Sequence, residues 1–274
     1  MVEESTENNL AVAPDGHKSL TIRNRKLIHR GLSQVRFRPR RMWFPSEYSI
    51  GTLFLESTNG EPSKNTEAVG EIEIPNDTLV RLRLHGNQIG YLLPLASLRS
   101  WDLHGLEFHG SRFDDSHLSY IAHLIGLNSL DLSHTGDSIT DLSHIARMIN
   151  LDELNLTQCA ISEEALESIC SLVKMKRLSL FGASSVRNLS FLRNMMGLER
   201  LDLKYTEVRD SSLVYVKDKR KLRELNLGGT MVTDQGLHYL FGLSNLRRLV
   251  LRETDVTTQG KEALQRHLPC CSIV

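Results

Sequence analysis

The stretch that decides the fold is 222–237, Leu-Arg-Glu-Leu-Asn-Leu-Gly-Gly-Thr-Met-Val-Thr-Asp-Gln-Gly-Leu. Its leucines stand at the first, fourth and sixth places, and two residues that are two apart lie on the same side of a β-strand. The same pattern, with Met or Phe as occasional substitutes, begins at Leu79, Leu103, Leu127, Leu151, Met175, Leu198, Leu222 and Leu246. The starts are 24 residues apart, except for one spacing of 23. Residues 79–274 therefore form an array of eight repeats.

One such unit cannot bury its own apolar face, but stacked neighbours can, so the array predicts a solenoid. Parallel strands need a crossover, and 24 residues leave room for a short helix between strands. We expect an α/β fold with a parallel sheet on the concave face and short helices or 3₁₀ turns on the convex face.

The repeat resembles those of the leucine-rich-repeat superfamily over about 70% of the chain (196 of 274 residues). Its Thr-rich Val-Thr-Asp phrase is similar to repeats of many bacterial proteins and to the Cys-containing repeats of F-box proteins. No F-box precedes the array, so a ubiquitin-ligase role is not carried over. The resemblance implies a strand in L-x-x-L-x-L, a turn and a convex segment.

Two further regularities refine this picture. The ninth position predicts a buried hydrogen-bonding ladder that is broken at Ala183 and made by Asn87, Ser111, Thr135, Cys159, Thr206, Thr230 and Thr254. The closer apolar spacing in Ile89–Leu95, Ile139–Ile145 and Val186–Leu192 indicates 3₁₀-like convex segments there.

The ends of the array need covers. We expect a flexible basic arm over 1–34 and a β-rich cap over 35–78, with strands at Val35–Pro39, Ile50–Leu55 and Ala68–Pro75 and a hairpin loop at 60–65. The C-terminal residues 264–274 look like a closing half-repeat of the bacterial type, in which a helix leads into a short strand. The alternative use of Cys271 is lipid attachment, since the last four residues match a loose prenylation box.

Composition excludes several classes of protein. Lys+Arg and Asp+Glu both number 33, which argues against a globally electrostatic partner such as bulk nucleic acid. Four cysteines make no disulfide framework, and no apolar run of 18 residues is present. The first residues lack a secretory pattern, so we expect a cytoplasmic and monomeric protein.

Candidate catalytic groups have simpler explanations. The recurrent acids Asp115, Asp141, Glu163, Asp210 and Asp234 occupy one repeat position, which indicates helix caps. His85 and His109 share position seven of neighbouring repeats and could hold a metal, but no acid or Cys is fixed nearby, so a solvated surface is favoured. Cys159 and Cys170 fall on core positions. No nucleophile, nucleotide or metal motif is found, so we predict no catalysis, cofactor or metal.

A binding site is expected on the concave face. Positions three, five and seven of each repeat alternate with the buried leucines and face outward. There, Phe181 and the neighbouring Tyr205 are large aromatics on a small, polar surface. Aromatic and Arg side chains are typical interface hot spots. We therefore expect a protein or peptide partner to contact Phe181, Tyr205, Arg177, Arg200, Lys204 and Asp202, the alternative being aromatics packed on their neighbours.

A second hypothesis concerns the segment 16–46, which carries nine Lys and Arg residues and no acid, interleaved with Phe37, Trp43 and Phe44. Such a segment can attach a protein to nucleic acid or another acidic surface. We favour a solvated linker followed by a strand with outward Arg side chains, because the repeats add no continuous basic surface.

Overall fold

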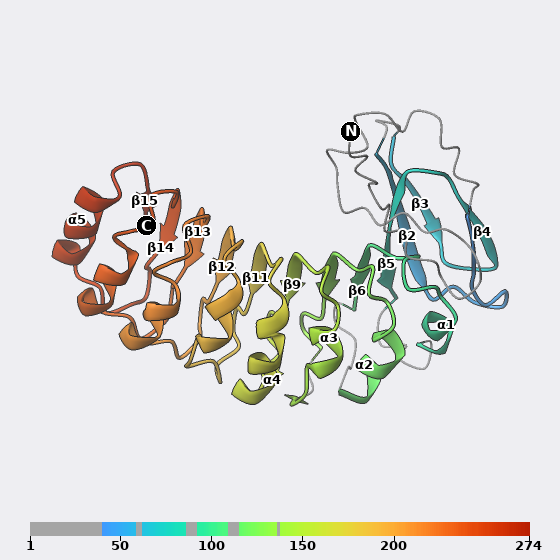
Figure 1. The fold of residues 1–274 in the computed structure, drawn as a ribbon, viewed down its shortest axis with the longest axis horizontal. Coiled ribbons are helices and arrows are strands. Elements are labelled where there is room, and N and C mark those ends of the chain that lie inside the picture. The colour runs from blue at the N-terminus through green and yellow to red at the C-terminus, as the bar shows by residue number, and fades with distance from the viewer. Residues whose placement is uncertain (1–39, 59–61, 86–91, 109–114, 136–137) are drawn as a thin grey trace, which may run out of the picture. The chain divides into compact units, whose positions relative to one another are not determined.

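A computed structural model describes residues 40–58, 62–85, 92–108, 115–135 and 138–274. These residues form an eleven-stranded sheet in the order β15-β14-β13-β12-β11-β9-β7-β6-β5-β2-β3 (Figure 1). Its strands are β2 (Gly51–Ser57), β3 (Lys64–Glu67), β5 (Thr78–Leu84), β6 (Gly105–Glu107), β7 (Ser129–Asp131), β9 (Glu153–Asn155), β11 (Arg177–Ser179), β12 (Arg200–Asp202), β13 (Glu224–Asn226), β14 (Arg248–Val250) and β15 (Ser272–Ile273).

The eight strands of the repeats, β5 to β14 in this sheet, pair in parallel and in one register. The second leucine of each repeat lies beside its counterpart in the next, as Leu178 does beside Leu201 and Leu201 beside Leu225. All eight of these leucines are buried. The structure thus confirms the predicted repeat frame and the parallel-sheet solenoid.

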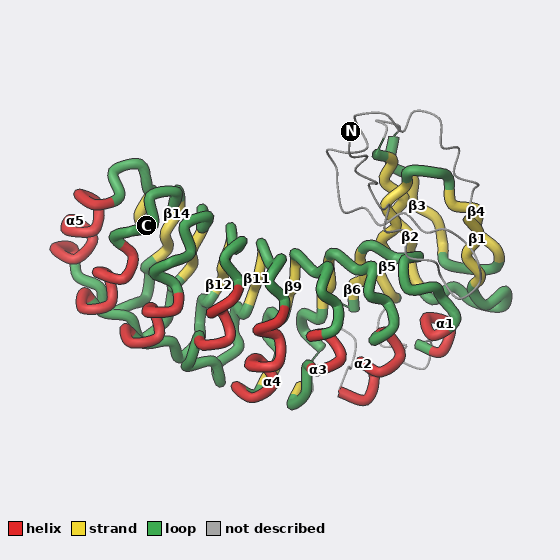
Figure 2. Tube along the Cα trace, in the orientation of Figure 1, coloured by secondary structure: helices red, strands yellow, loops and turns green. Residues whose placement is uncertain are grey.

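Short helical segments lie on the side of the repeats opposite the exposed sheet face (Figure 2). They are α1 (Leu93–Ala96), α2 (Asp115–Ile121), α3 (Ser143–Ala146), α4 (Glu163–Ser168), α5 (Thr258–His267) and the 3₁₀ helices η2 (Ile169–Ser171), η3 (Ser190–Asn194), η4 (Asp210–Tyr215) and η5 (Asp234–Leu240). Two short strands, β8 (Ser138–Ile139) and β10 (Ala160–Ile161), pair beside α3 and α4.

The predicted distribution of 3₁₀ segments is only partly right. The unit at Val186–Leu192 does contain a 3₁₀ helix, η3, but Ile139–Ile145 leads into α3, an α-helical turn. The first three residues of Ile89–Leu95 lie outside the described part, and the rest enters α1, which is also an α-helical turn. Conversely, η4 and η5 follow the Val-x-Asp phrase and are 3₁₀ helices. Apolar spacing alone did not fix the helix type, because the convex turns are too short for it to decide.

The N-terminal cover is β-rich, as predicted, although its strands are arranged differently. Antiparallel β2 joins the cap to the first repeat along β5, and β3 extends the sheet beyond β2. A separate antiparallel pair is made by β1 (Arg40–Trp43) and β4 (Glu71–Ile74). The predicted strand Val35–Pro39 lies outside the described residues. The β3 strand was missed, because its residues Lys64–Glu67 are polar and half of them fall in the predicted loop.

The C-terminal cover matches the predicted half-repeat. Helix α5 ends at His267, the chain turns at buried Leu268, and β15 pairs in parallel with β14. Cys271 is buried in this turn, and burial raises the pKa of its thiol. The thiol that a prenyl group would need is therefore part of the packed end of the sheet.

The position-nine ladder is confirmed where it is described. The hydroxyls of Thr206, Thr230 and Thr254 each donate to a carbonyl three residues earlier, at 2.6 to 2.7 Å. The Cys159 thiol donates to the carbonyl of Leu132 at 2.9 Å. Asn87 and Ser111 lie outside the described residues.

Candidate functional site

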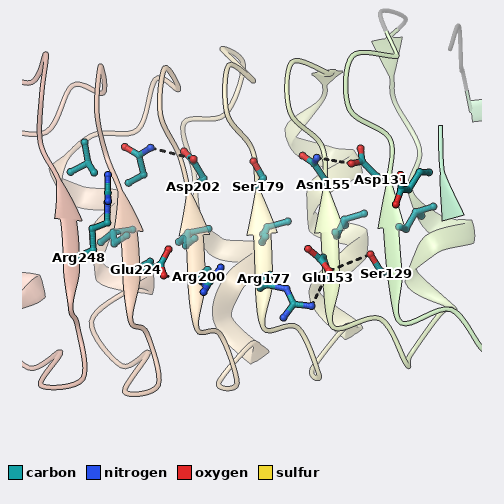
Figure 3. Close-up of a pocket in the computed structure, with 18 of the residues that line it drawn as sticks. Ser129, Asp131, Glu153, Asn155, Arg177, Ser179, Arg200, Asp202, Glu224 and Arg248 are labelled. Carbon is teal, nitrogen blue, oxygen red and sulfur yellow. Dashed lines mark hydrogen bonds and ion pairs between the residues drawn. The ribbon is translucent and has the colours of Figure 1, made fainter. Parts of the chain in front are cut away.

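The exposed face of the repeat sheet holds a shallow groove of about 510 Å³ (Figure 3). Its walls are the outward side chains at positions three and five, with the strands β7 to β14 as its floor. The polar side chains that line it form two rows across the strands: Ser129, Glu153, Arg177, Arg200, Glu224 and Arg248 in one, and Asp131, Asn155, Ser179, Asp202 and Asn226 in the other.

The position-five row is tied into the backbone. The Asp202 carboxylate accepts the backbone N–H of Lys204 at 2.9 Å and the side-chain amide of Asn226 at 3.2 Å. Asp131 and Asn155 make the corresponding pair, at 2.9 Å. These residues hold the turn after each strand. Asp202 therefore has a structural role, whatever it contacts in a partner.

The position-three row is a chain of ion pairs. Arg177 donates to Glu153 at 2.8 Å, and this hydrogen bond raises the pKa of Arg177. Arg200 lies 3.3 Å from Glu224. Each of these arginines thus neutralises an acid of an adjacent repeat.

Phe181 and Tyr205 do come together, at the ends of β11 and β12. Their ring centroids are 5.7 Å apart in an edge-to-face arrangement. The ammonium of Lys204 lies 4.4 Å from the centroid of Tyr205 and 5.9 Å from that of Phe181. Tyr205 is 42% exposed. We call these three residues the aromatic cluster.

Arg177 and Arg200 are the first residues of β11 and β12, whereas the aromatic cluster follows the last residues of these strands. Each arginine pairs with an acid of a neighbouring repeat. The predicted contact residues therefore include two groups: the aromatic cluster after the ends of the strands, and an ion-paired row at their beginnings.

The backbone under the cluster has a conformation that recurs along the array. In the described repeats the residue after each strand's turn has a positive φ, and at Tyr205 φ is 58°. The repeats on either side have Gly182 and Gly229 at this position, with φ of 72° and 66°. A Cβ at Gly229 would overlap the Tyr205 ring. Glycine next to Tyr205 thus leaves room for the ring, while Tyr205 itself keeps a conformation that favours glycine.

Two cations of the last repeat, Arg248 at the start of β14 and Arg252 just after it, add to the face. Within the described residues, Arg248 and Arg252 form no ion pair, unlike Arg177 and Arg200. Both side chains are exposed. The uncompensated positive charge of the face is therefore found in its C-terminal repeats.

The recurrent acids of the convex side act in two ways. Asp141 accepts the N–H and the hydroxyl of Ser143 at the start of α3, at 2.7 and 2.9 Å, which agrees with the predicted role at a helix start. Asp210 and Asp234 instead join one repeat to the next.

Asp210 accepts the backbone N–H and the hydroxyl of Thr233, both at 2.8 Å, and Asp234 does the same with Thr257 at 2.8 and 2.6 Å. The cap of α5 is Thr257, which accepts the N–H of Gly260. A bond between repeats cannot be seen when each repeat is considered singly.

The described end of the basic 16–46 segment is not a basic surface. The Arg40 guanidinium is half-buried and donates to the carbonyls of Trp101 and Asp102, at 3.4 and 3.0 Å, while its Nε has no partner. Burial lowers the pKa of Arg40. Exposed Arg41 pairs with Glu71 at 2.7 Å. The expectation of outward arginines is thus wrong for Arg40.

The histidines hold no described metal site. His85 lies 2.9 Å from the Thr52 hydroxyl and 3.7 Å from Glu67, and His109 is outside the described residues. No group of three metal-ligating side chains occurs in the described part of the chain. His104 is different: its Nδ1 accepts the N–H of Val80 at 3.1 Å, and burial, with the nearby Arg40, lowers its pKa to about 4.

No protein-family model and no curated protein matches the sequence. Solved structures are similar at the level of the fold. An internalin from Listeria monocytogenes superposes with a TM-score of 0.57 at 22% identity, and the match covers 71% of this chain and 59% of that one. A second Listeria internalin, C2, has a TM-score of 0.49 at 20% identity, covering 68% and 73%. The mouse RP105/MD-1 complex gives 0.50 at 20% identity, covering 64% and 30%.

This chain thus spans less than two thirds of the first internalin, and the likeness extends to the fold alone. Among the helices of the described residues, none combines the length and the apolar character needed to cross a membrane.

Proposed function

We propose that this chain, whose fold is the leucine-rich-repeat solenoid, is a non-catalytic scaffold that binds a protein or peptide through the exposed face of its sheet. The observation that carries the proposal is the aromatic cluster. Phe181 and Tyr205 stand edge to face beside Lys204, on a face whose other outward side chains are mostly small or polar. Tyr and Phe beside a cation supply large apolar area together with directional contacts, as interface hot spots do.

The exposure of the Tyr205 ring supports a role beyond packing. The positive φ at its position recurs in the repeats, where His134, Gln158 and Glu253 also have it, so the backbone does not dictate which side chain stands there. Its neighbours Gly182 and Gly229 show that the turn itself does not need a side chain there. The tyrosine ring projects as a 42% exposed surface rather than into the core. We infer that the ring is kept for contact with a partner.

The charges indicate the partner's character. Lys204, Arg248 and Arg252 have no carboxylate partner among the described residues, whereas Arg177 and Arg200 are paired. A partner that places an apolar group on the aromatic cluster and carboxylates towards β14 would satisfy both features. The fold is compatible with such a role, since RP105 was solved in a complex with MD-1.

The alternative, attachment to nucleic acid through the 16–46 segment, has less support. The Arg40 guanidinium is half-buried and bonds backbone carbonyls, and Arg41 is paired, so neither is available for such attachment at the described end of the segment. Residues 16–39 are outside the described part. The alternative remains useful as a competing outcome of the experiment.

The test is affinity capture from native lysate, with and without nuclease, followed by titration of the captured protein. Tyr205→Gly is the sharpest variant, because both neighbouring repeats carry glycine there and the turn should be unharmed. We expect Tyr205→Gly combined with Phe181→Ala to weaken binding at least about tenfold, since hot-spot residues contribute about 2 kcal/mol or more each. Phe241→Ala, an exposed aromatic of the convex side, is the matched control.

Equal binding by wild type and the double variant would contradict the proposal. Recovery of nuclease-sensitive material alone, bound equally by both, would make the basic segment the functional element and the repeats its support.

A further inference from the structure

A row of exposed aliphatic side chains follows one edge of the solenoid, in the loops that lead into the strands. The residue two places before the repeat start is Ile125, Ile149, Val173 and Met196 in four consecutive repeats, and these are 37%, 48%, 54% and 51% exposed. Solvent-exposed loops ordinarily carry polar side chains, and single exposed aliphatics need no explanation. Four in register on one edge form a continuous apolar feature, which we call the edge ridge.

Contacts between the loops place the ridge residues on neighbouring turns of one edge. The Asn150 side chain donates to the carbonyl of Ile125 at 3.0 Å, and Lys174 donates to the Asn150 side chain at 2.6 Å. Gly197, next to Met196, packs near the carbonyl of Val173. With about 4.8 Å between neighbouring strands, the four side chains extend over about 15 Å in a line.

The ridge ends in a cluster of positive charge. Arg220 occupies the next place in the row, and it donates to the carbonyl of Gly242 in the following repeat at 3.3 Å. The one exposed acid in these fully described loops is Asp218. The other exposed charged side chains around Arg220 are cationic, and with it they form a basic cluster: Lys217, Arg220, Lys221, Arg223 and Arg247. Arg223 and Arg247 lie side by side, since the N–H of Arg247 donates to the carbonyl of Arg223 at 2.8 Å.

The ridge meets this basic cluster directly. The Lys219 side chain, which is only 1% exposed, places its ammonium 3.7 Å from the sulfur of Met196 and 2.6 Å from the carbonyl of Leu192. Along the ridge itself, Lys176 neutralises Asp152 at 2.7 Å. The edge as a whole is therefore apolar over four repeats and cationic over the next two.

We propose that this edge is a docking surface for an anionic lipid bilayer. The aliphatic ridge would enter the interfacial region while the basic cluster contacts lipid phosphates and carboxylates, the combination that makes reversible peripheral binding. A bilayer fits because the ridge residues lie exposed in the loops that lead into the strands, below the strands in Figure 3, and not in the groove of the sheet face. Phe181 and Tyr205 lie at the other ends of the strands, so the sheet face stays open to its own partner.

A second copy of this chain fits the edge less well. Antiparallel pairing would bring the basic cluster of one copy to the Trp101 and Ile125 end of the other, where the loops carry Arg99 and His123 but no exposed carboxylate among the described residues. Parallel pairing would bring the two basic clusters together. Charge thus opposes self-association through this edge.

The test is cosedimentation of the full chain with vesicles of phosphatidylcholine alone or with about one third phosphatidylserine. We expect binding to the anionic vesicles only, weakening as salt is raised, because screening reduces the attraction of exposed charges. Replacing the four ridge residues by serine should weaken binding at least about tenfold, as should replacing Lys217, Arg220, Lys221 and Arg223 by serine. Met231→Ser with Phe241→Ser, exposed apolar residues elsewhere, is the control and should bind as wild type.

A separate variant guards against misfolding of the ridge mutant. Met196→Trp should show a blue shift of tryptophan emission on addition of anionic vesicles. A further variant of the full chain tests whether the N-terminal segment is responsible for vesicle binding. In it, serine replaces Arg23, Arg25, Lys26 and Arg30. The proposal is overturned if the chain does not bind anionic vesicles, or if only the N-terminal variant loses binding. It is also overturned if the ridge variant binds as well as wild type, or if wild type forms a concentration-dependent dimer that the ridge substitutions abolish.

Discussion

The two ends of the solenoid are closed by different means. At the C-terminus, β15 continues the parallel register of β14, and α5 stands where a further convex segment would be. At the N-terminus, antiparallel β2 pairs with β5, and the half-buried Arg40 fastens the cap to the first repeats. One end prolongs the repeat, and the other joins it to a different structure.

The difference shows where unique polar contacts are needed. At the C-terminal end the apolar positions and the acid-to-threonine bridges are copies of those inside the array. A cap with another strand direction cannot use those copies. It is joined by the pairing of β2 with β5 and by a contact that is not part of the repeat pattern, from the Arg40 guanidinium to the carbonyls of Trp101 and Asp102. Beside it, His104 bonds the first two repeats to each other. Stability should therefore depend on few residues at the N-terminal end and on many at the other.

The largest expected effect tests this dependence at Arg40. Arg40→Ala removes the donors to the carbonyls of Trp101 and Asp102 and leaves a cavity. We expect a loss of about 3 to 4 kcal/mol in the free energy of unfolding, measured with urea. Arg40→Met keeps the apolar stem and avoids burying a charge, so its loss should be smaller by about 1 kcal/mol or more. Equal, small losses for both would show that the cap is held by its strands alone.

The second prediction concerns pH and His104, whose pKa is lowered to about 4 in the folded chain. The imidazole binds a proton near pH 6.5 in the unfolded chain but resists it in the folded one, so stability should fall as pH decreases from about 6.5 to about 4. A shift of this size corresponds to about 3 kcal/mol. Protonation would remove the Nδ1 acceptor of the Val80 N–H and repel Arg40.

The measurement is urea unfolding across this pH range for wild type and His104→Asn, whose amide oxygen can replace Nδ1 as acceptor. The variant should lose less stability on acidification, while carboxylates contribute equally to both chains. Parallel curves for the two proteins would contradict the assignment of the acid sensitivity to His104.

Features that depend on the repeat period could be predicted well from the sequence. Leucines 24 residues apart fix the strand register, so the proximity of Phe181 and Tyr205 could be predicted from position alone. The roles of Arg177 and Arg200 could not, because a long side chain reaches an acid of the neighbouring repeat. The period also does not reveal Lys219, which fills an apolar position by burying its stem and bonding carbonyls with its ammonium.

The N-terminal cap was predicted only in outline for a related reason. Alternating apolar residues indicate the strands at Gly51–Ser57 and Glu71–Ile74, but they do not say which strands pair. Arg40 stands in a run of arginines that suggests a solvated segment, and only the fold shows that its guanidinium bonds the carbonyl of Asp102. Contacts that occur once leave no periodic signal.

The smallest expected effect tests the C-terminal end. The Asp234 carboxylate accepts the N–H and hydroxyl of Thr257, and this hydroxyl in turn accepts the N–H of Gly260 at the start of α5. Asp234→Asn should therefore cost about 1 kcal/mol in the free energy of unfolding, as the loss of one cap interaction does. Thr257→Val should cost a similar amount, and the double variant should lose less than the two losses combined, because both act on one chain of hydrogen bonds.

The control is Glu262→Gln, which changes an exposed acid on the same helix. A loss at Asp234 as large as that at Arg40 would mean that the C-terminal end also depends on a single contact, and the contrast between the two ends would then fail.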